Sequence, residues 1–154
     1  MANHIEGTLI GTGLKIAIIA TRWNDFMGHR MLSGAQDALI RHGVDDQNIT
    51  IITIPGCYEI PLTAQKVANS GKYDAVVCLG VLIRGGTIHF DLIASEATKG
   101  INSAALAANI PVTFGVITTE NIEQAIERSG SKAGNKGEEA ALAAIEMANV
   151  LKKL

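Results

Sequence analysis

An apolar run ends abruptly at a cation, two glycines and a histidine in the segment VLIRGGTIHFD, residues 81–91. Glycine-rich backbone between a strand and a helix presents N–H groups to an anion, and the dipole of the following helix adds to the attraction. His89 falls in the first turn of the expected helix, and histidine is the side chain that titrates closest to neutral pH. The segment therefore indicates either a phosphate site with a proton-transfer group beside it or an ordinary strand-to-helix turn.

A second candidate for anion binding is the glycine-rich segment ERSGSKAGNKG, residues 127–137. Its cations, Arg128, Lys132 and Lys136, are separated by glycines that would let them converge on one anion. A solvated basic loop is the simpler interpretation of such a charge run. Both interpretations stay open on the residues alone.

Ligand-contacting side chains are also expected where other apolar runs end. Trp23 ends the first run, and it either packs in the core or stacks its flat ring on a heterocycle. Glu59 follows Pro55-Gly56 and would bind polyol hydroxyls or pair with a lysine. Phe114 stands in the middle of an apolar run, and its position alone indicates a core residue.

Short apolar runs alternate with helical patterns along the chain, and these elements must position the candidate residues. Four of the runs are expected to be strands: 15–23, 49–56, 75–83 and 111–119. Five segments are expected to be helices: 31–43, 61–71, 89–109, 120–130 and 137–154. The alternation predicts one three-layer, doubly wound α/β domain with a four-stranded parallel sheet covered by helices on both faces. Ligands of such folds bind at the carboxyl ends of the strands, where most of the candidate residues fall.

The composition is that of a soluble globular chain, with 47% hydrophobic and 18% charged residues among 154. A formal net charge of −2 argues against nucleic acid as a partner. No apolar run approaches the ~20 residues of a membrane helix, and residues 1–11 lack the pattern of a signal peptide. Cys57 and Cys78 lie in or beside apolar runs, as in proteins of a reducing compartment. We therefore expect a cytoplasmic protein with neither a membrane nor a nucleic-acid partner.

The first residues look like an extra short strand with glycine turns, IEGTLIGTGL at 5–14. The expected organisation is therefore an N-terminal extension, 1–14, followed by one domain, 15–154. Gly11 and Gly13 precede the first long strand, so they do not match a dinucleotide-binding loop, and no GxxxxGK[ST] loop occurs.

The remaining patterns bear on metals and on oligomer contacts. The histidines other than His89 show no metal-ligand spacing with the cysteines, so neither a metal nor a cofactor is expected. The segment INSAALAANI, 101–110, has no charged residue. It is expected to be covered on more than one side, either by another subunit or by deep burial.

Taken together, five segments resemble the lumazine synthase family, which acts at the penultimate step of riboflavin biosynthesis. They are RWND (22–25), PGCYEIP (55–61), GVLIRGGTIHFD (80–91), FGVITTENIEQAIERSGSKAGNKG (114–137) and AAIEMAN (143–149). The resemblance implies a flavodoxin-like fold and a transferase that condenses 5-amino-6-ribitylamino-2,4-pyrimidinedione with 3,4-dihydroxy-2-butanone 4-phosphate. The products would be 6,7-dimethyl-8-ribityllumazine, phosphate and water, formed without a cofactor or metal.

The resemblance also implies a role for each candidate residue. His89 matches the proton donor and acceptor, and Gly86, Thr87 and Arg128 match the phosphate-binding residues. The residues that match the pyrimidine and ribityl pocket are Trp23, Cys57, Tyr58, Glu59, Val81, Leu82, Ile83, Phe114 and Lys136. Phe114 matches a position that an adjacent subunit contributes, which revises its interpretation as a core residue.

Members of the family assemble as pentamers with sites between adjacent subunits, and some build icosahedral shells of twelve pentamers. The resemblance therefore implies a homo-oligomer, with riboflavin synthase as a further partner and with segment 5–14 added to a neighbour's sheet. Two alternatives with the same fold stay open: a non-catalytic protein that binds flavin or lumazine, and a structural shell protein. The anion site argues against both, because a binder of unphosphorylated riboflavin does not need Gly86, Thr87, Arg128 and His89 together.

Overall fold

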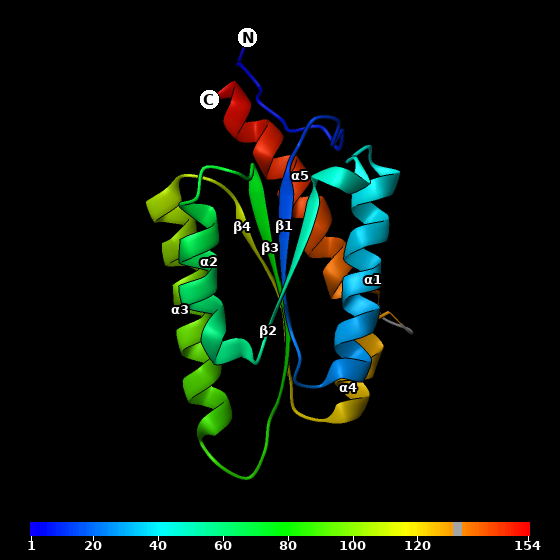
Figure 1. Ribbon diagram of the computed structural model, residues 1–154, viewed down its shortest axis with the longest axis vertical. Coiled ribbons are helices and arrows are strands. Elements are labelled where there is room, and N and C mark those ends of the chain that lie inside the picture. The colour runs from blue at the N-terminus through cyan, green and yellow to red at the C-terminus, as the bar shows by residue number, and fades with distance from the viewer. Residues whose placement is uncertain (131–133) are drawn as a thin grey trace.

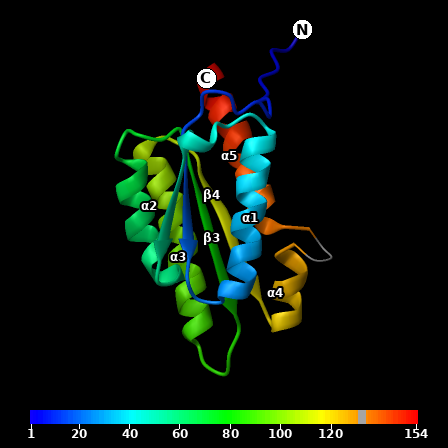
Figure 2. The same cartoon turned by 45° about the vertical axis from the view of Figure 1, so that its right-hand side comes forward.

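A computed structural model describes residues 1–130 and 134–154, so Lys132 of the basic loop lies outside the described residues. Its centre is a parallel sheet of four strands in the order β2-β1-β3-β4. The strands are β1 (Ile16–Thr21), β2 (Ile49–Ile54), β3 (Ala75–Ile83) and β4 (Val112–Thr119). The α-helices are α1 (Asp25–Arg41), α2 (Ile60–Ala68), α3 (His89–Ala108), α4 (Ile122–Arg128) and α5 (Lys136–Lys153). Figure 1 shows α2 and α3 on one face of the sheet and α1, α4 and α5 on the other, and Figure 2 shows the same layers after a turn. The predicted three-layer α/β fold is confirmed.

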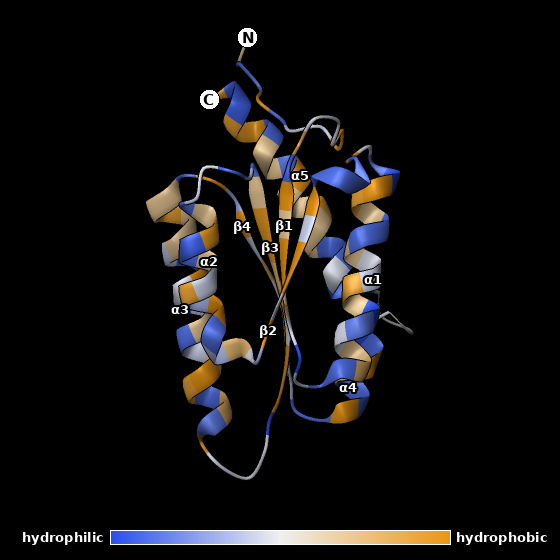
Figure 3. Cartoon of the chain, in the orientation of Figure 1, coloured by the Kyte–Doolittle hydropathy of each residue, from blue (hydrophilic) through white to orange (hydrophobic). Residues whose placement is uncertain are grey.

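The two central strands, β1 and β3, form the middle of the hydrophobic core. Every residue of β1 is buried, as are the first seven residues of β3, and both strands consist almost entirely of apolar residues. Figure 3 shows this apolar centre as the hydrophobic colour along the strands. The outer strands are less covered, since Ile51 of β2 is 41% exposed and Phe114 of β4 is 38% exposed. The expected helices on both faces are confirmed; they bury β1 and most of β3 completely and leave individual residues of the two edge strands partly exposed.

Each face of the sheet carries its own apolar cluster. On the α1 and α5 face, the largest fully buried side chains are Leu14, Ile16, Ile18, Met31, Leu39, Val77, Leu79 and Ile145. On the α2 and α3 face, they are Ile19, Ile60, Val76 and Val116. Side chains alternate between the two faces along a strand, so consecutive residues such as Ile18 and Ile19 serve opposite clusters.

A glycine follows shortly after the end of three of the helices. Gly43, Gly71 and Gly130 follow α1, α2 and α4 with φ angles of 97°, 74° and 120°. This left-handed conformation is disfavoured for residues with a Cβ, so each glycine lets the chain turn away from its helix.

The first helix is longer than predicted, because α1 begins at Asp25 and not at residue 31. β1 also ends at Thr21, so Trp23 lies in the turn and not in the strand. Asp25, Gly28 and Arg30 interrupt the apolar pattern in the first turns of α1, although Met27 and Met31 are both buried at a spacing of one helical turn. Asn24 starts the helix from a left-handed backbone with a φ angle of 59°.

The N-terminal segment lies along the end of α5 and forms no strand within residues 1–15, all of which the structure describes. The amide of Asn149 donates hydrogen bonds to the carbonyl oxygens of Thr8 and Ile10 at 2.8 and 2.9 Å. Lys153 Nζ donates to the carbonyl oxygen of Glu6 at 2.6 Å. Both termini are therefore at the amino end of the sheet (Figure 1), and the addition of this segment to a neighbour's sheet stays a prediction.

Candidate active site

A cavity of about 680 Å³ opens at the carboxyl ends of β1, β2 and β3. It lies where the chain's strand order reverses, between β1 and β3, which is the usual ligand position in open parallel sheets. Its lining residues come from the three strand ends and the start of α3: Trp23, Asn24, Gly56, Cys57, Tyr58, Glu59, Val81, Leu82, Ile83, His89 and Ile93. Eight of the residues predicted from the sequence are therefore brought together in one cavity.

The turn after β1 supplies an aromatic wall. Trp23 is 71% exposed, so its alternative interpretation as a core residue is wrong. The ring lies against Gly56, where an added Cβ would come within 2.9 Å of Trp23 Cδ1. The absence of a side chain at Gly56 thus lets the ring lie across the strand end with one face available to a flat ligand.

The turn after β2, which begins beside the Trp23 ring, supplies the next part of the lining. Residues 57–59 form one turn of 3-10 helix that leads directly into α2. Cys57 points inward and is 5% exposed, whereas Tyr58 is 66% exposed at the rim. Thr63 Oγ1 donates a hydrogen bond to the carbonyl oxygen of Glu59 at 2.8 Å, which ties this turn to α2.

The segment after β3 carries the anion-binding and proton-transfer candidates. Gly85 and Gly86 have open space where a Cβ would stand, so a ligand can approach their backbone closely. Thr87 Oγ1 accepts a hydrogen bond from the backbone N–H of His89 at 3.3 Å, at the first residue of α3. The N-terminal dipole of this helix, 20 residues long, points at the same place and favours an anion there.

Five predicted residues do not line the cavity of this single chain: Gly86 and Thr87, which precede His89 in the segment after β3, and Phe114, Arg128 and Lys136. Phe114 lies on β4, and a separate cavity of about 540 Å³ between α3 and β4 includes it. Arg128 is the last residue of α4 and is exposed. Lys136 is the first residue of α5, with Nζ 3.9 Å from Glu139 Oε1.

Sequence reasoning assigned no site role to three lining residues, Asn24, Gly56 and Ile93. Asn24 Nδ2 donates a hydrogen bond to the carbonyl oxygen of Val81 at 3.2 Å, so it joins the ends of β1 and β3. The signal for Ile93 was present, because it follows His89 by one helical turn and so shares its face of α3. No sequence pattern indicated the left-handed backbone that turns Asn24 toward Val81.

The two cysteines are expected to stay unreactive toward a thiol reagent at pH 8 while the protein is folded. Burial raises the pKa of Cys57 to about 12, against a backbone hydrogen bond from Val81 that lowers it and the Glu59 charge that raises it. Burial, with Cys57 nearby, also raises the pKa of Cys78 to about 12. Reagent titration should therefore detect no accessible thiol in buffer and both thiols in urea, and fast labelling of the folded protein would contradict this.

The raised pKa values of the two thiols determine how the stability of the fold depends on pH. The unfolded chain loses these thiol protons near pH 9.0, whereas the folded chain keeps them until about pH 12. Their stabilising contribution is complete below pH 9 and is lost as the pH rises between these values. Urea unfolding at pH 8 and at pH 10 measures this loss.

The described residues, 1–130 and 134–154, contain no group of three or more His, Cys, Asp and Glu side chains that could hold a metal ion. Among the same residues, no helix has the length and apolar character needed to cross a membrane.

A family model described as 6,7-dimethyl-8-ribityllumazine synthase matches residues 13–152. The match covers all four strands, all five α-helices except the last residue of α5, and the whole cavity lining.

Proposed function

Because the chain belongs to the 6,7-dimethyl-8-ribityllumazine synthase family, we propose that it catalyses the formation of this lumazine from two substrates. The substrates are 5-amino-6-ribitylamino-2,4-pyrimidinedione and 3,4-dihydroxy-2-butanone 4-phosphate. The observation that carries the proposal is the single cavity at the strand ends, which combines an exposed tryptophan ring, strand-end backbone and His89. A heterocycle, a polyol chain and a phosphate each have a suitable partner at or beside it.

The pyrimidine ring would stack on Trp23, whose exposed face is large and flat. Its polar edges would bond to the backbone of Val81, Leu82 and Ile83, where β3 ends and its N–H and C=O groups become available. The ribityl hydroxyls would bond to Glu59 and to the backbone beside Cys57. Tyr58, at the rim, would cover the bound ligand.

The reaction follows from the groups of the two substrates. The primary amine attacks the ketone, and loss of water gives an imine. A proton leaves the adjacent carbon, and the carbon–oxygen bond to phosphate breaks with its electron pair staying on phosphate. Loss of phosphate leaves an enol, which takes up a proton at its terminal carbon and becomes a ketone. The ribitylamino nitrogen then attacks this new carbonyl, and a second water leaves as the ring closes. The balance is one lumazine, one phosphate and two waters for one molecule of each substrate.

His89 would move the protons in these steps. It stands at the first residue of α3, beside the phosphate-binding backbone, and it lines the same cavity as the ring-binding residues. A histidine side chain gains and loses a proton readily near neutral pH. It can therefore accept a proton from carbon in one step and donate it to a leaving oxygen in another. The phosphate is already a good leaving group, so no cofactor or metal is required by the proposed steps.

The phosphate would be held by the backbone of Gly86 and Thr87 at the start of α3 and by the guanidinium of Arg128. Since Arg128 does not line the cavity of its own chain, we propose that it comes from an adjacent subunit, together with Phe114 and Lys136.

Replacement of Arg128 by alanine is expected to raise the apparent KM for the phosphate substrate by about 10- to 100-fold, because a charge-assisted hydrogen bond is worth about 1.5–3 kcal/mol. The KM for the pyrimidine substrate should change little. Steady-state kinetics with each substrate varied in turn measures both values. The matched control is Arg41→Ala, which removes an exposed arginine whose partner is Asp37 on its own helix. An unchanged KM for the phosphate substrate in Arg128→Ala would count against the role.

The proposed assembly is a pentamer with sites shared between neighbours. The apolar side chains left exposed on single-chain edges support it, among them Ile51 on β2 and Leu106 on α3, the latter 75% exposed in the charge-free segment 101–110. We propose that residues 1–14 form an extension from the domain of residues 15–154 and add a strand beside a neighbour's sheet. Twelve pentamers would form a shell, with riboflavin synthase as a partner. Light scattering distinguishes the states, and a particle no larger than a pentamer would contradict the shell.

We also propose a cytoplasmic location, which the two free cysteines support, since unpaired buried thiols are typical of reducing compartments.

The test of the proposed reaction is a product balance. The purified protein is incubated with both substrates, and lumazine and inorganic phosphate are measured over time. We expect equal amounts of the two products and none when either substrate is omitted, after subtraction of the uncatalysed reaction. Phosphate release without lumazine would contradict the proposed condensation.

A further inference from the structure

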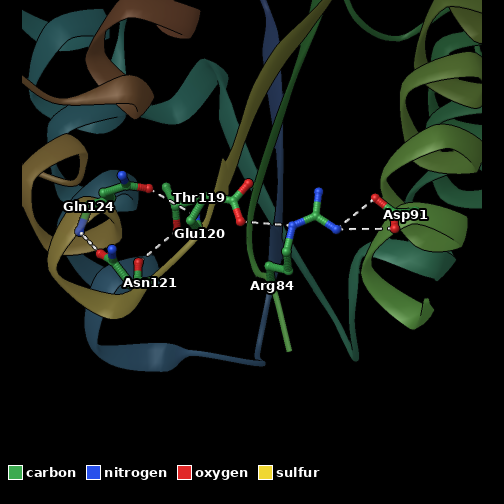
Figure 4. Close-up of polar contacts among 6 residues, drawn as sticks. All are labelled: Arg84, Asp91, Thr119, Glu120, Asn121 and Gln124. Carbon is green, nitrogen blue, oxygen red and sulfur yellow. Dashed lines mark hydrogen bonds and ion pairs between the residues drawn. The ribbon is translucent and has the colours of Figure 1, made fainter. Parts of the chain in front are cut away.

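An arginine at the end of β3 joins the start of α3 to the end of β4. Arg84 Nη1 lies 3.1 Å from each carboxylate oxygen of Asp91, and Arg84 Nε lies 2.9 Å from Glu120 Oε2. Figure 4 shows the guanidinium between the two carboxylates, which come from opposite sides. Its central carbon also lies 4.5 Å from the centre of the Phe90 ring, within the range of a cation–π contact. The guanidinium is thus bound to both residues that directly follow His89.

The end of β4, next to Glu120, is held in place by further hydrogen bonds. The backbone N–H of Arg84 donates to the carbonyl oxygen of Thr119 at 2.8 Å, one residue before Glu120. Gln124 Oε1 accepts a hydrogen bond from the backbone N–H of Glu120 at 2.9 Å, and Thr119 Oγ1 donates to the carbonyl oxygen of Asn121 at 2.9 Å. Figure 4 shows the contacts of Glu120 with Gln124 and of Thr119 with Asn121. Arg84 therefore connects the start of α3 to a strand end that is itself stabilised by hydrogen bonds.

The start of α3 has few other restraints. Residues 84–89 are all exposed, and Gly85 and Gly86 have no neighbour where a Cβ would stand. No side chain caps the helix at Ile88, and the first fully buried residue of α3 is Ala97, two turns after His89. Figure 1 shows this end of α3 projecting beyond the start of α2. The direction of the first turn is therefore not set by core packing.

Helix geometry connects these contacts to His89. Successive residues are turned by about 100° around a helix, so Asp91 stands on nearly the opposite side from His89, whereas Ile93 shares its side. His89 and Ile93 line the candidate active site, whereas Phe90 and Ala94 line the cavity beside β4 that also includes Arg84. Holding Asp91 and Phe90 toward β4 thus keeps His89 turned toward the active-site cavity.

We propose that Arg84 is a positioning residue for His89, which it orients by holding Asp91 and Phe90 against the end of β4. The proposal rests on the proposed function, since it is through His89 that the contact affects the reaction. Arg84 is poorly placed to be the phosphate-binding cation, because two carboxylates already neutralise it and would repel a third anion. A positioning role predicts a loss of kcat with substrate binding preserved.

The variant Arg84→Met tests this role, because it keeps an unbranched apolar stem and removes the guanidinium. We expect kcat for lumazine formation to fall about tenfold, since misplacement of a catalytic group by a fraction of an ångström to an ångström is costly. The KM for each substrate should stay within about twofold of the wild-type value. Arg84→Lys should recover only part of the loss, because one ammonium group lacks the planar fork that reaches two carboxylates. Arg41→Met is the matched control, since it breaks an exposed pair with Asp37, 2.9 Å long, and should leave kcat unchanged.

Two further measurements separate positioning from a general structural effect. In a His89→Ala background, Arg84→Met should cause no additional loss of kcat, because the group that it orients is already gone. Amide hydrogen exchange in residues 88–96 should become faster in Arg84→Met, while the thermal midpoint of the protein changes by less than about 2 °C.

The proposal is overturned if Arg84→Met lowers the rate equally with and without His89, if kcat is unchanged, or if only the KM for the phosphate substrate rises. Unchanged exchange in residues 88–96 would also overturn it, and this readout does not depend on turnover. A wild-type protein that forms no lumazine would overturn the proposed function instead, and the exchange rates would still decide whether Arg84 restrains the helix.

Discussion

Replacement of His89 by alanine is expected to lower kcat for lumazine formation by about 100-fold, at the lower end of the contribution of a single proton-transfer group. The variant should remain faster than the uncatalysed reaction, because the proposed site would still hold both substrates in contact. Initial rates at saturating substrate, followed by lumazine absorbance, measure the effect. The side chain is exposed at a helix start, so the fold should tolerate its loss.

The control for this experiment is His42→Gln, at the opposite end of α1 from the cavity, where the ring contacts the carbonyl oxygen of Ala38 at 2.8 Å. Its kcat should equal that of the wild type. Two outcomes would contradict the proposed role of His89: an unchanged rate in His89→Ala, and complete loss of catalysis in a protein that still folds and binds ligand.

The largest loss of stability is expected from Gly137→Ala, at the start of α5. Gly137 is buried, and a Cβ added there would overlap the backbone carbonyl of Met31 on α1. Neither backbone can move without disturbing the apolar cluster that α1 and α5 share with the sheet. We expect the free energy of unfolding to fall by about 3 kcal/mol, since overpacking against fixed backbone is among the costly core changes. Urea unfolding measures the change.

Gly28→Ala is the matched control, because Gly28 also lies in a helix and its Cβ would meet only the carbonyl oxygen of Thr21, at 3.6 Å. Alanine should be neutral there or stabilise the helix by about 0.5–1 kcal/mol relative to glycine. Equal stability of the two variants would show that the close approach of α1 and α5 at Gly137 does not limit the packing.

The sequence predicted most of the site because its chemistry is local to strand ends. Apolar runs located β1, β2 and β3, and the rule for parallel sheets then placed Trp23, Cys57 and His89 at one edge. The same reasoning did not find the start of α1, because Asn24 starts the helix from a left-handed backbone and Gly28 and Arg30 interrupt the apolar pattern before Met31. It also missed the role of Arg84, since Glu120 is brought beside it only by the pairing of β3 with β4.

Three predicted site residues lie away from the cavity in the single chain. Phe114, Arg128 and Lys136 do not line the cavity of His89, and their proposed place in the site requires a second copy of the chain. An apolar residue in a strand pattern is predicted to be buried. An apolar residue that is exposed on an edge strand shows the same pattern as a core residue, so the pattern does not distinguish the two. Only the family resemblance separated these cases for Phe114.

The central claim is that the protein turns over the two substrates and does not merely bind a flavin-like ring. The most direct measurement is the initial rate of lumazine formation by the purified wild-type protein, with the uncatalysed rate subtracted. The account predicts a rate well above background that falls in both His89→Ala and Arg128→Ala. A background rate from a folded oligomer that still binds riboflavin would contradict it and would identify a binding protein of the same fold.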